Sequence, residues 1–552
     1  MPHGRRRGRR HPPHGRGEDR HGDAHREPAP GRERRGRGEA EDRRVRHRLR
    51  GRPRGAEPPG GVGGARPVGR AHHEAGSEEE DEGHMSASRM SRAIAGAEDL
   101  EAGDAALACE LVEVWRRHRA RNKLRTDYYL GHRKARDLCI SVPPHLRNLR
   151  QVVSWPAKAV DSLADRSVFD AFICDGEERA AALRKMADAN GLARAYRRAV
   201  ISELKHGTAF ATVASGGEGR PAVVRFYPAT AAAALWDFPR DRILAGMVVV
   251  DTSREAGRRG EPTWVNLYTD EAVVRIREAG GRWRAEYEPH SMGRPLMEPL
   301  CYQATLERPF GRSRITRAVM DITDDAQRAC RRAEIAAEFA ASTQKYLLGA
   351  PDDVFDEKSR WDAALDAIVT FSKDADGDAP SFGQLAQPSM QPHTEYYRSL
   401  AARFSSETSI PLSCLGVNTD ANPQSADAAR VEAEPLVIEA QNVNADNGRA
   451  LRNVAYMALA AANDTGFEAE ASASDPVSVH FKDPSMPSLS SVSDAIVKQV
   501  QAFPWMAESD VPLERLGYTD EEIQRLANAR ERAKSADVIG MMLGGDGDAA
   551  QA

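Results

Sequence analysis

The hydrophobic pattern changes period along the chain, and this change limits the folds open to it. Between Thr208 and Tyr302, short segments rich in β-branched and aromatic residues, such as AVVRFYPA and TWVNLYTD, are separated by turns that include GGEG at Gly216–Gly219. On both sides, apolar residues recur at helical spacing, as they do over Asp104–Gly131, Glu177–His206 and Ser313–Ser342. The pattern predicts an antiparallel β meander flanked by helices, which is an α+β fold.

A second stretch, SIPLSCLGVNTDANPQSADAARVEAEPLVIEAQ, sets a polar loop between two predicted helices. A helix over Thr394–Thr408 is expected to end here, because Pro411 cannot donate a hydrogen bond inside a helix and Gly416 permits a turn. A long helix then runs from Ser425 to about Ala462, with a kink expected at Pro435. The polar residues between the two helices include no catalytic-looking side chain.

Shorter patterns complete the predicted element order. We expect Ser313 to cap its helix, with Ile315, Val319, Ile322 and Ala326 on one buried face. The remaining expected elements are a helix over Val152–Leu163, a strand over Val168–Cys174, a small helix over Trp361–Val369, an extended segment from Val477, and helices that begin near Ser493 and Thr519.

The composition breaks sharply after residue 84. Residues 1–84 contain 21 Arg and 17 Gly but no Lys, Asn, Gln, Thr, Ile, Phe, Tyr, Trp or Cys. Such a segment cannot bury enough apolar surface to offset its ordering entropy, so disorder is predicted. One interpretation is a basic arm that binds nucleic-acid phosphates. The other is a GC-rich upstream region translated from a start placed too early, with Met85 or Met90 as the true start; the last residues, 536–552, are also expected to be disordered.

The charge and cysteine content of the rest exclude several classes of protein. Residues 85–552 hold 57 of the 78 basic and 67 of the 82 acidic residues, a balance of −10, which argues against a simple phosphate-binding surface. The six cysteines form no CxxC pair and have no histidine at metal-ligand spacing, so we expect reduced core thiols. No run approaches the roughly 18 apolar residues of a membrane helix, and no membrane role is predicted.

A search for catalytic signatures is negative. The sequence contains no GxxxxGK[ST], HExxH or GxSxG motif, and no dinucleotide-binding GxGxxG at a strand-to-helix turn, so no catalytic, cofactor-binding or metal residue is assigned. His206 could act as a general base, although a histidine at a helix end is more often a cap or a surface residue. The basic segment RRHRARNKLR could contact nucleic acid, or it could be a solvated or subunit-contacting face.

Several motifs, in this order, resemble the portal proteins of tailed bacteriophages, and most closely the siphophage type of actinobacterial phages and prophages. Each motif is weak alone, whereas their order over Ala97–Arg532 is specific. They are YYLG (Tyr128–Gly131), VPP (Val142–Pro144), VVSWPAKAVDSLADRSVFDAF (Val152–Phe172), HGTAFATV (His206–Val213), ERPFGRSRI (Glu307–Ile315), SIPLSCLG (Ser409–Gly416), NPQSADA (Asn422–Ala428), KDPSMPSLSSVSDAIVKQV (Lys482–Val500) and LGYTDEEIQRL (Leu516–Leu526).

The resemblance implies a ring-forming portal-type fold. Its expected parts are an α+β wing over 85–312, stem helices over 313–342 and 393–409, a small α/β clip over 343–392, a tunnel loop over 410–424, a kinked long helix with inner wing over 425–490, and crown helices over 491–535. The tunnel loop is expected to present Val417, Asn418, Thr419, Asp420, Asn422 and Gln424 to DNA.

The resemblance also implies a function. The implied function is that of a homo-oligomeric ring of twelve subunits at one capsid vertex, through which double-stranded DNA is packaged and ejected. Its implied partners are the terminase large subunit, head-tail adaptors, and the major capsid and scaffolding proteins; its implied location is the virion, with assembly in the host cytoplasm. The alternatives are a DNA-packaging enzyme of the ATPase-nuclease type, which the absence of a Walker-type loop disfavours, and an Arg-rich nucleic-acid-binding protein.

Overall fold

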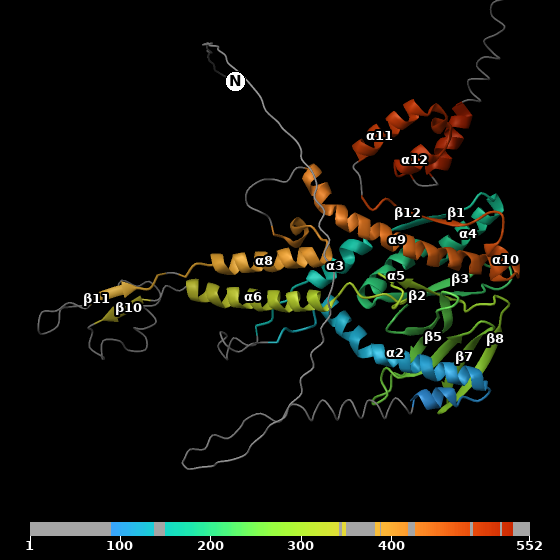
Figure 1. The fold of residues 1–552 in the computed structure, drawn as a ribbon, viewed down its shortest axis with the longest axis horizontal. Coiled ribbons are helices and arrows are strands. Elements are labelled where there is room, and N and C mark those ends of the chain that lie inside the picture. The colour runs from blue at the N-terminus through green and yellow to red at the C-terminus, as the bar shows by residue number, and fades with distance from the viewer. Residues whose placement is uncertain are drawn as a thin grey trace, which may run out of the picture. The chain divides into compact units, whose positions relative to one another are not determined.

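The computed structural model describes residues 90–136, 149–341, 345–348, 381–386, 388–417, 426–485, 489–518 and 522–533. The chain divides into two units, 1–70 and 71–552, and every described residue belongs to the second. Helices and sheets mix within that unit, as an α+β fold requires (Figure 1).

The part of the chain that precedes β2 is mainly helical. The long helix predicted over Asp104–Gly131 is confirmed, and it ends just before Gly131, whose φ of 67° is open to glycine at little cost. Gly191 likewise separates two helices at a φ of 54°. The elements are α2 (Ala102–Tyr129), α3 (Trp155–Ala164), α4 (Glu177–Asn190) and α5 (Leu192–His206), preceded by a helical turn over 90–95.

The predicted single meander is wrong in one respect, because the strands form two sheets. A five-stranded antiparallel sheet follows chain order, β4-β5-β6-β7-β8, whereas a three-stranded sheet has the order β3-β2-β9. The strands are β2 (Thr208–Ala214), β3 (Val223–Pro228), β4 (Ala232–Asp237), β5 (Arg242–Thr252), β6 (Pro262–Tyr268), β7 (Ala272–Ala279), β8 (Arg282–Pro289) and β9 (Met297–Cys301).

The physical reason is a non-local pairing. β9 leaves β8 and pairs antiparallel with β2, so that Thr208 lies opposite Cys301. The alternation of apolar and polar residues within one strand cannot reveal such a pairing, because the pairing depends on which strand edge is still unpaired once the other strands have folded. The GGEG segment does connect the antiparallel strands β2 and β3, as a hairpin turn should.

A further sheet joins segments from distant parts of the sequence. The strand predicted near Val168–Cys174 is β1 (Phe169–Ile173), and its antiparallel partner is β12 (Ser478–Phe481) within the predicted extended segment. Phe169 lies opposite Phe481, and both rings pack near Tyr196 of α5. The sheet therefore ties the C-terminal part of the chain to α5.

The two expected stem helices lie side by side (Figure 1). They are α6 (Arg317–Ala341) and α8 (Gln391–Thr408), and the described part of the chain between them includes the antiparallel strands β10 (Lys345–Leu348) and β11 (Ser381–Gln384). Trp155 of α3 stacks against Tyr397 and Phe404 of α8, with ring centroids 5.2 and 5.1 Å apart. The small helix predicted over Trp361–Val369 lies outside the described residues.

Ser313 does not cap α6, which corrects the predicted helix start. Its Oγ atom donates instead to the main-chain oxygen of Lys205, 2.5 Å away, at the end of α5. Thr316 takes the capping position, because its Oγ1 atom accepts a hydrogen bond from the Val319 amide at 3.2 Å. The predicted buried face is confirmed, since Ile315, Val319, Ile322 and Ala326 are all at most 2% exposed.

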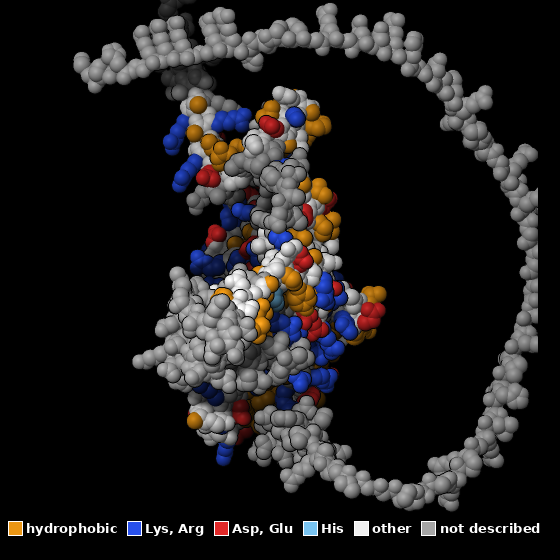
Figure 2. Space-filling model, turned by 90° about the vertical axis from the view of Figure 1, so that its left-hand side faces the viewer, with side chains coloured by type: hydrophobic (Ala, Val, Ile, Leu, Met, Phe, Trp, Pro, Cys, Tyr) orange, Lys and Arg blue, Asp and Glu red, His pale blue; other side chains and the backbone are white. Residues whose placement is uncertain are grey.

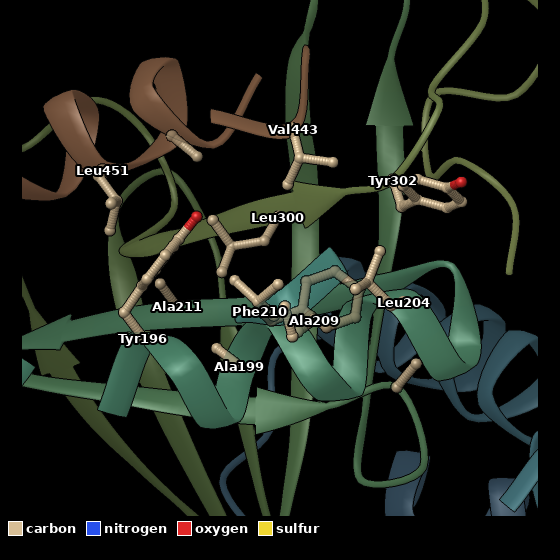
Figure 3. Close-up of a cluster of buried hydrophobic side chains, with 14 of the residues drawn as sticks. Tyr196, Ala199, Leu204, Ala209, Phe210, Ala211, Leu300, Tyr302, Val443 and Leu451 are labelled. Atoms are coloured by element: carbon tan, nitrogen blue, oxygen red, sulfur yellow. The ribbon is translucent and has the colours of Figure 1, made fainter. Parts of the chain in front are cut away.

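The long helix α9 (Ala426–Asn463) packs its second half into the larger core, and it continues through Pro435. Figure 3 shows this core, where side chains of α5, β2 and β9 meet those of α9. The labelled residues of the cluster include Tyr196, Leu204, Phe210, Leu300, Val443 and Leu451. A smaller core lies between α2 and the five-stranded sheet, with Leu111, Trp115, Leu267 and Ile276 among its members.

The C-terminal part is helical, as predicted. It contains α10 (Phe467–Ala471), α11 (Leu489–Ala502), the 3-10 helix η3 (Pro504–Glu508), α12 (Val511–Arg515) and a helix over 522–533. Within the described ranges, no helix has both the length and the apolar character needed to cross a membrane. The five described cysteines are free, as expected, but only Cys301 is buried and Cys414 is exposed, so the prediction of core thiols is wrong for Cys414.

Candidate functional site at the base of the 410–424 segment

The segment predicted to contact DNA begins where α8 ends. Ser409 takes the left-handed conformation, Pro411 precedes the 3-10 helix η2 (Leu412–Leu415), and Gly416 turns the chain with a φ of 75°. The helix therefore ends before Pro411 and the turn falls at Gly416, as the sequence predicted. Of the expected DNA-contacting residues, Val417 is partly buried against the larger core, while Asn418, Thr419, Asp420, Asn422 and Gln424 lie outside the described residues.

Hydrogen bonds tie the start of this segment to both α9 and α8. The amide of Leu412 donates to Oε1 of Glu432 on α9 over 2.9 Å. On the α8 side, the Oγ atom of Ser405 donates to the main-chain oxygen of Ile410 at 2.7 Å. Because Leu412 and Glu432 are 20 positions apart, the segment leaves one helix and returns to the next at an anchored base.

Arg314 is the centre of the packing behind that base. Its guanidinium group donates to three acceptors, which are the main-chain oxygen of Ala159 on α3 at 2.7 Å, the main-chain oxygen of Thr408 at 2.5 Å and the Tyr302 hydroxyl at 2.9 Å. It also forms an ion pair with Glu439 of α9. One side chain thus connects α3, the start of α6, the end of α8, and α9.

Burial makes these contacts energetically important. Arg314 is 4% exposed, and an arginine withdrawn from water is stable only when its charge and its donors have partners. Burial, together with Glu439, raises the pKa of Tyr302, so its hydroxyl stays protonated and donates to Glu439. The other carboxylate oxygen of Glu439 is buried and has no hydrogen-bond partner among the described residues. The network is therefore held by Arg314, whose loss would leave a buried carboxylate uncompensated.

A cavity of about 540 Å³ opens beside this network. Its walls come from the turn after β9 and from α9, and they include Tyr302, Gln303, Arg312, Glu439 and Asp446. Burial raises the pKa of Asp446. The described part of the chain contains no group of three or more His, Cys, Asp or Glu residues able to hold a metal ion.

His206 does not fit a role as general base or surface residue. It is the last residue of α5, it is 7% exposed, and its ring nitrogens lie 3.0 Å from Thr126 Oγ1 and 3.3 Å from Ser202 Oγ. Burial, followed by the charges of Lys205 and Arg125, lowers its pKa to about 3. A base with so low a pKa is a poor proton acceptor at neutral pH, so His206 is a packed structural residue.

A second buried polar group lies between α5 and α9. Glu203 is fully buried, its Oε2 atom accepts a hydrogen bond from Asn447 Nδ2 at 2.9 Å, and burial raises its pKa to about 8. The same amide nitrogen of Asn447 lies 3.1 Å from the Tyr196 hydroxyl, which points toward α9 in Figure 3. These contacts fix α9 against α5 and involve no nucleophile.

The sequence interpretation missed Arg314, Tyr302, Glu432 and Glu439. Their partners come from separate helices, so spacing along the chain could not bring them together. One signal was present, because Arg314 lies inside the motif ERPFGRSRI, where the neighbouring Ser313 and Ile315 occupy positions that proved to be buried. A charged residue in such a setting needs a buried partner.

One face of the molecule carries charges of both signs. On the face shown in Figure 2, Lys and Arg side chains are mixed with Asp, Glu and hydrophobic side chains.

Comparisons with known proteins agree on one family. The family model described as "Phage portal protein, SPP1 Gp6-like" matches residues 110–536. The portal protein of Mycobacterium phage D29 is 24% identical over 478 residues, which cover 83% of this chain and 95% of the relative. The portal protein of Mycobacterium phage L5 is 24% identical over 441 residues, covering 76% of this chain and 87% of the relative.

Solved structures of gene transfer agent particles also match. A chain from "Virion of native gene transfer agent (GTA) particle" is 14% identical with a TM-score of 0.38, covering 69% of this chain and 94% of that chain. A chain from "Neck of native GTA particle computed with C12 symmetry" is 13% identical with a TM-score of 0.38, covering 72% of this chain and 96% of that chain.

The family is structural rather than enzymatic, and no comparison supports a packaging enzyme or an Arg-rich nucleic-acid-binding protein. The family match extends over both larger sheets, α6, α8, η2 and α9 alike. The chain therefore belongs to the SPP1 Gp6-like family of phage portal proteins, the proteins of the capsid vertex.

Proposed function

We propose that the chain forms a closed ring of twelve copies, the number that the resemblance implies, through which double-stranded DNA enters and leaves the capsid. In this proposal the ring binds the terminase large subunit during packaging and a head-tail adaptor afterwards, and it contacts the major capsid and scaffolding proteins. Assembly takes place in the host cytoplasm, and the finished ring belongs to the virion.

We assign the parts of the chain to this ring as follows. Residues 85–312 form the wing, α6 and α8 the stem, 343–392 the clip, 410–424 the tunnel loop, α9 and the chain to 490 the inner wing, and 491–535 the crown. A closed ring repeats one heterologous contact, which requires extended side faces rather than a pocket, and the 25-residue helix α6 and the 38-residue helix α9 supply such faces.

One observation carries the assignment of the tunnel loop. The 410–424 segment leaves a stem helix and returns to α9 at a base held by the Leu412–Glu432 hydrogen bond and by the buried Arg314 network. A loop that touches a moving duplex needs a fixed base, because a loosely attached loop would move along with the DNA. Its residues should also bind phosphate weakly, since each neutralised phosphate adds affinity that would arrest the DNA. Asp420 and the amides of Asn418, Asn422 and Gln424 satisfy that requirement.

The test replaces Asn418 and Asp420 with arginine in the full chain and measures packaging in a phage that lacks its own portal gene. We expect nuclease-resistant DNA per particle to fall several-fold, because arginines would hold the duplex. Ring formation, followed by native mass spectrometry, should be unchanged. The matched control is Ser472→Arg, which places the same charge at an exposed position after α10. Unchanged packaging in the double variant would contradict the tunnel-loop assignment, and a wild-type chain that stays monomeric would contradict the ring.

A further inference from the structure

A second cavity, of about 470 Å³, lies between α2 and the turn that precedes α6. One wall belongs to the basic segment of α2 and contains Trp115, His118, Arg121 and Arg125. The other belongs to residues 307–312, which carry Arg308, Phe310 and Arg312. The segment RRHRARNKLR, which the sequence left open between nucleic-acid contact and subunit contact, thus faces a defined hollow.

The ionisable groups around this cavity are almost all cationic. Arg121, Arg125, Arg308 and Arg312 line it together with His118, and Glu307 is the one acidic residue among the lining residues that the structure describes. Within the described ranges, none of the four arginines lies within ion-pair distance of a carboxylate. Burial, and then the charge of Arg121, lowers the pKa of Arg125 to about 10. Like charges therefore meet here, and Glu307 is the one lining carboxylate of the described residues that could offset them.

Both walls are fixed by contacts that their own lining residues make with the rest of the chain. Trp115 Nε1 donates to the main-chain oxygen of Thr230 at 2.8 Å, and Asn122 Nδ2 donates to that of Ala229 at 3.2 Å, so α2 is held against the chain before β4. On the other wall, the Phe310 ring packs 6.1 Å from Phe210 and 5.6 Å from Trp236. The backbone segments that carry the arginines are thus held in place, while the side chains of Arg121, Arg308 and Arg312 are exposed to a partner.

The neighbouring turn adds an apolar group to this surface. The amide of Thr305 donates to the main-chain oxygen of Arg308 at 3.1 Å, and the amide of Arg308 donates back at 3.0 Å. This tight turn leaves Leu306 91% exposed, the largest exposed fraction of any large apolar side chain in the described part of the chain. An exposed leucine among arginines is typical of a protein contact, whereas a phosphate-binding surface has no use for the leucine.

We propose that this cavity is a subunit-contact site that receives an aspartate or glutamate side chain from a second copy of the chain, and that the same neighbour covers Leu306. The heterologous contact of a ring brings a different surface of the neighbour to this wall. A second copy can supply the carboxylate, because residues 85–552 hold 67 acidic and 57 basic residues and so carry a net negative charge. Duplex DNA is the weaker occupant, because four arginines on a DNA path would bind phosphate strongly enough to slow translocation.

The inference rests on the proposed ring, and the first experiment separates the two. Full-length wild type, the double variant Arg121→Glu/Arg308→Glu and the control Arg117→Glu are compared by native mass spectrometry over a dilution series. Arg117 lies on the same helix and is exposed, but it does not line the cavity. We expect the double variant to need about tenfold more protein for half-maximal ring formation, and the control to match wild type. Leu306→Ser should weaken the ring in the same direction without any change of charge.

Equal ring formation by wild type and the double variant would overturn the inference and leave the proposed function intact. Monomeric wild type would overturn both. A double variant that forms full rings but loses affinity for a fluorescent 20-base-pair duplex would identify DNA as the occupant and also overturn the inference.

A second measurement keeps the test independent of how well the charge variants fold. The photoreactive residue p-benzoylphenylalanine replaces Arg121, the ring is irradiated, and crosslinked peptides are identified by mass spectrometry. We expect crosslinks between two copies of the chain, in a peptide that contains Asp or Glu. Crosslinks confined to single chains would overturn the proposal, and the same residue at position 117 supplies the background.

Discussion

The Nη2 atom of Arg314 donates a hydrogen bond over 2.5 Å to the main-chain oxygen of Thr408, a residue 94 positions away. Arg314 precedes α6 and Thr408 ends α8, so this contact joins the start of α6 to the end of α8, where the proposed tunnel loop begins. The Oγ1 hydroxyl of Thr408 in turn donates a hydrogen bond to the main-chain oxygen of Phe404 at 2.7 Å. The end of α8 is therefore tied to a residue nearly a hundred positions earlier in the chain.

Removing this arginine should destabilise the fold strongly. Arg314→Met leaves Glu439 as a buried carboxylate without its cation, and such a change costs about 3 kcal/mol or more. We expect a clear fall in the midpoint of denaturant unfolding. The double variant Arg314→Met/Glu439→Leu should recover part of the loss, because it removes the uncompensated charge as well. A single-variant loss below about 1 kcal/mol would show that the network is not the support described above.

Glu203 should make the protein less stable as the pH rises. Its pKa is about 8 in the fold and near 4.5 in an ordinary setting, so between these values unfolding releases a proton. The free energy of unfolding then falls by at most about 1.4 kcal/mol per pH unit from this group. Thermal unfolding of Glu203→Gln should depend less on pH between 5 and 8 than that of wild type. The exposed Glu178→Gln is the control, and a pH dependence identical to wild type in Glu203→Gln would refute the prediction.

His206 should act in the opposite direction. Its pKa is about 3 in the fold and 6.5 in an ordinary setting, so between these values unfolding takes up a proton and stability falls as the pH falls. His206→Gln removes this uptake, and its melting temperature should decline less than that of wild type between pH 6.5 and 4.5. His132→Gln, at an exposed position, serves as the control. Equal declines in wild type and His206→Gln would contradict the assigned burial.

Gly311 should not tolerate a methyl group. Its φ is 65°, and an added Cβ atom would lie 2.3 Å from the main-chain oxygen of Tyr302. Gly219 has a similar φ of 68° with no atom within 4 Å, so it provides a matched control for backbone strain alone. We expect Gly219→Ala to cost about 1 kcal/mol and Gly311→Ala distinctly more in denaturant unfolding. Equal losses would mean that the close approach to Tyr302 relaxes freely.

The sequence predicted the local elements better than their partners. The periods over α2, α6 and α9, and the turns at Gly191 and Gly416, follow from side-chain spacing and backbone preference, and the structure confirms them. Ser313 shows why a helix cap can be predicted wrongly. Its hydroxyl could have bonded to the first turn of its own helix, but in the folded chain it donates to the main-chain oxygen of Lys205 at the end of α5. The pairing of β9 with β2 depends on surfaces that exist only after folding.

The candidate site divides in the same way. The motif order indicated the family, and Pro411 and Gly416 located the start of the loop. Arg314, Glu432 and Glu439 could not be found from the sequence, because their role depends on three helices meeting around one guanidinium group.

The pairing of β1 with β12 has a consequence for synthesis on the ribosome. β1 is made early, but its partner Ser478–Phe481 emerges about three hundred residues later. Until then β1 lacks this neighbour, and its unpaired edge remains open to other chains. A nascent or prematurely released chain is thus incomplete at a point well inside its fold. Completion of translation becomes a condition for a finished subunit, which disfavours the entry of truncated copies into a particle that has no means of replacing them.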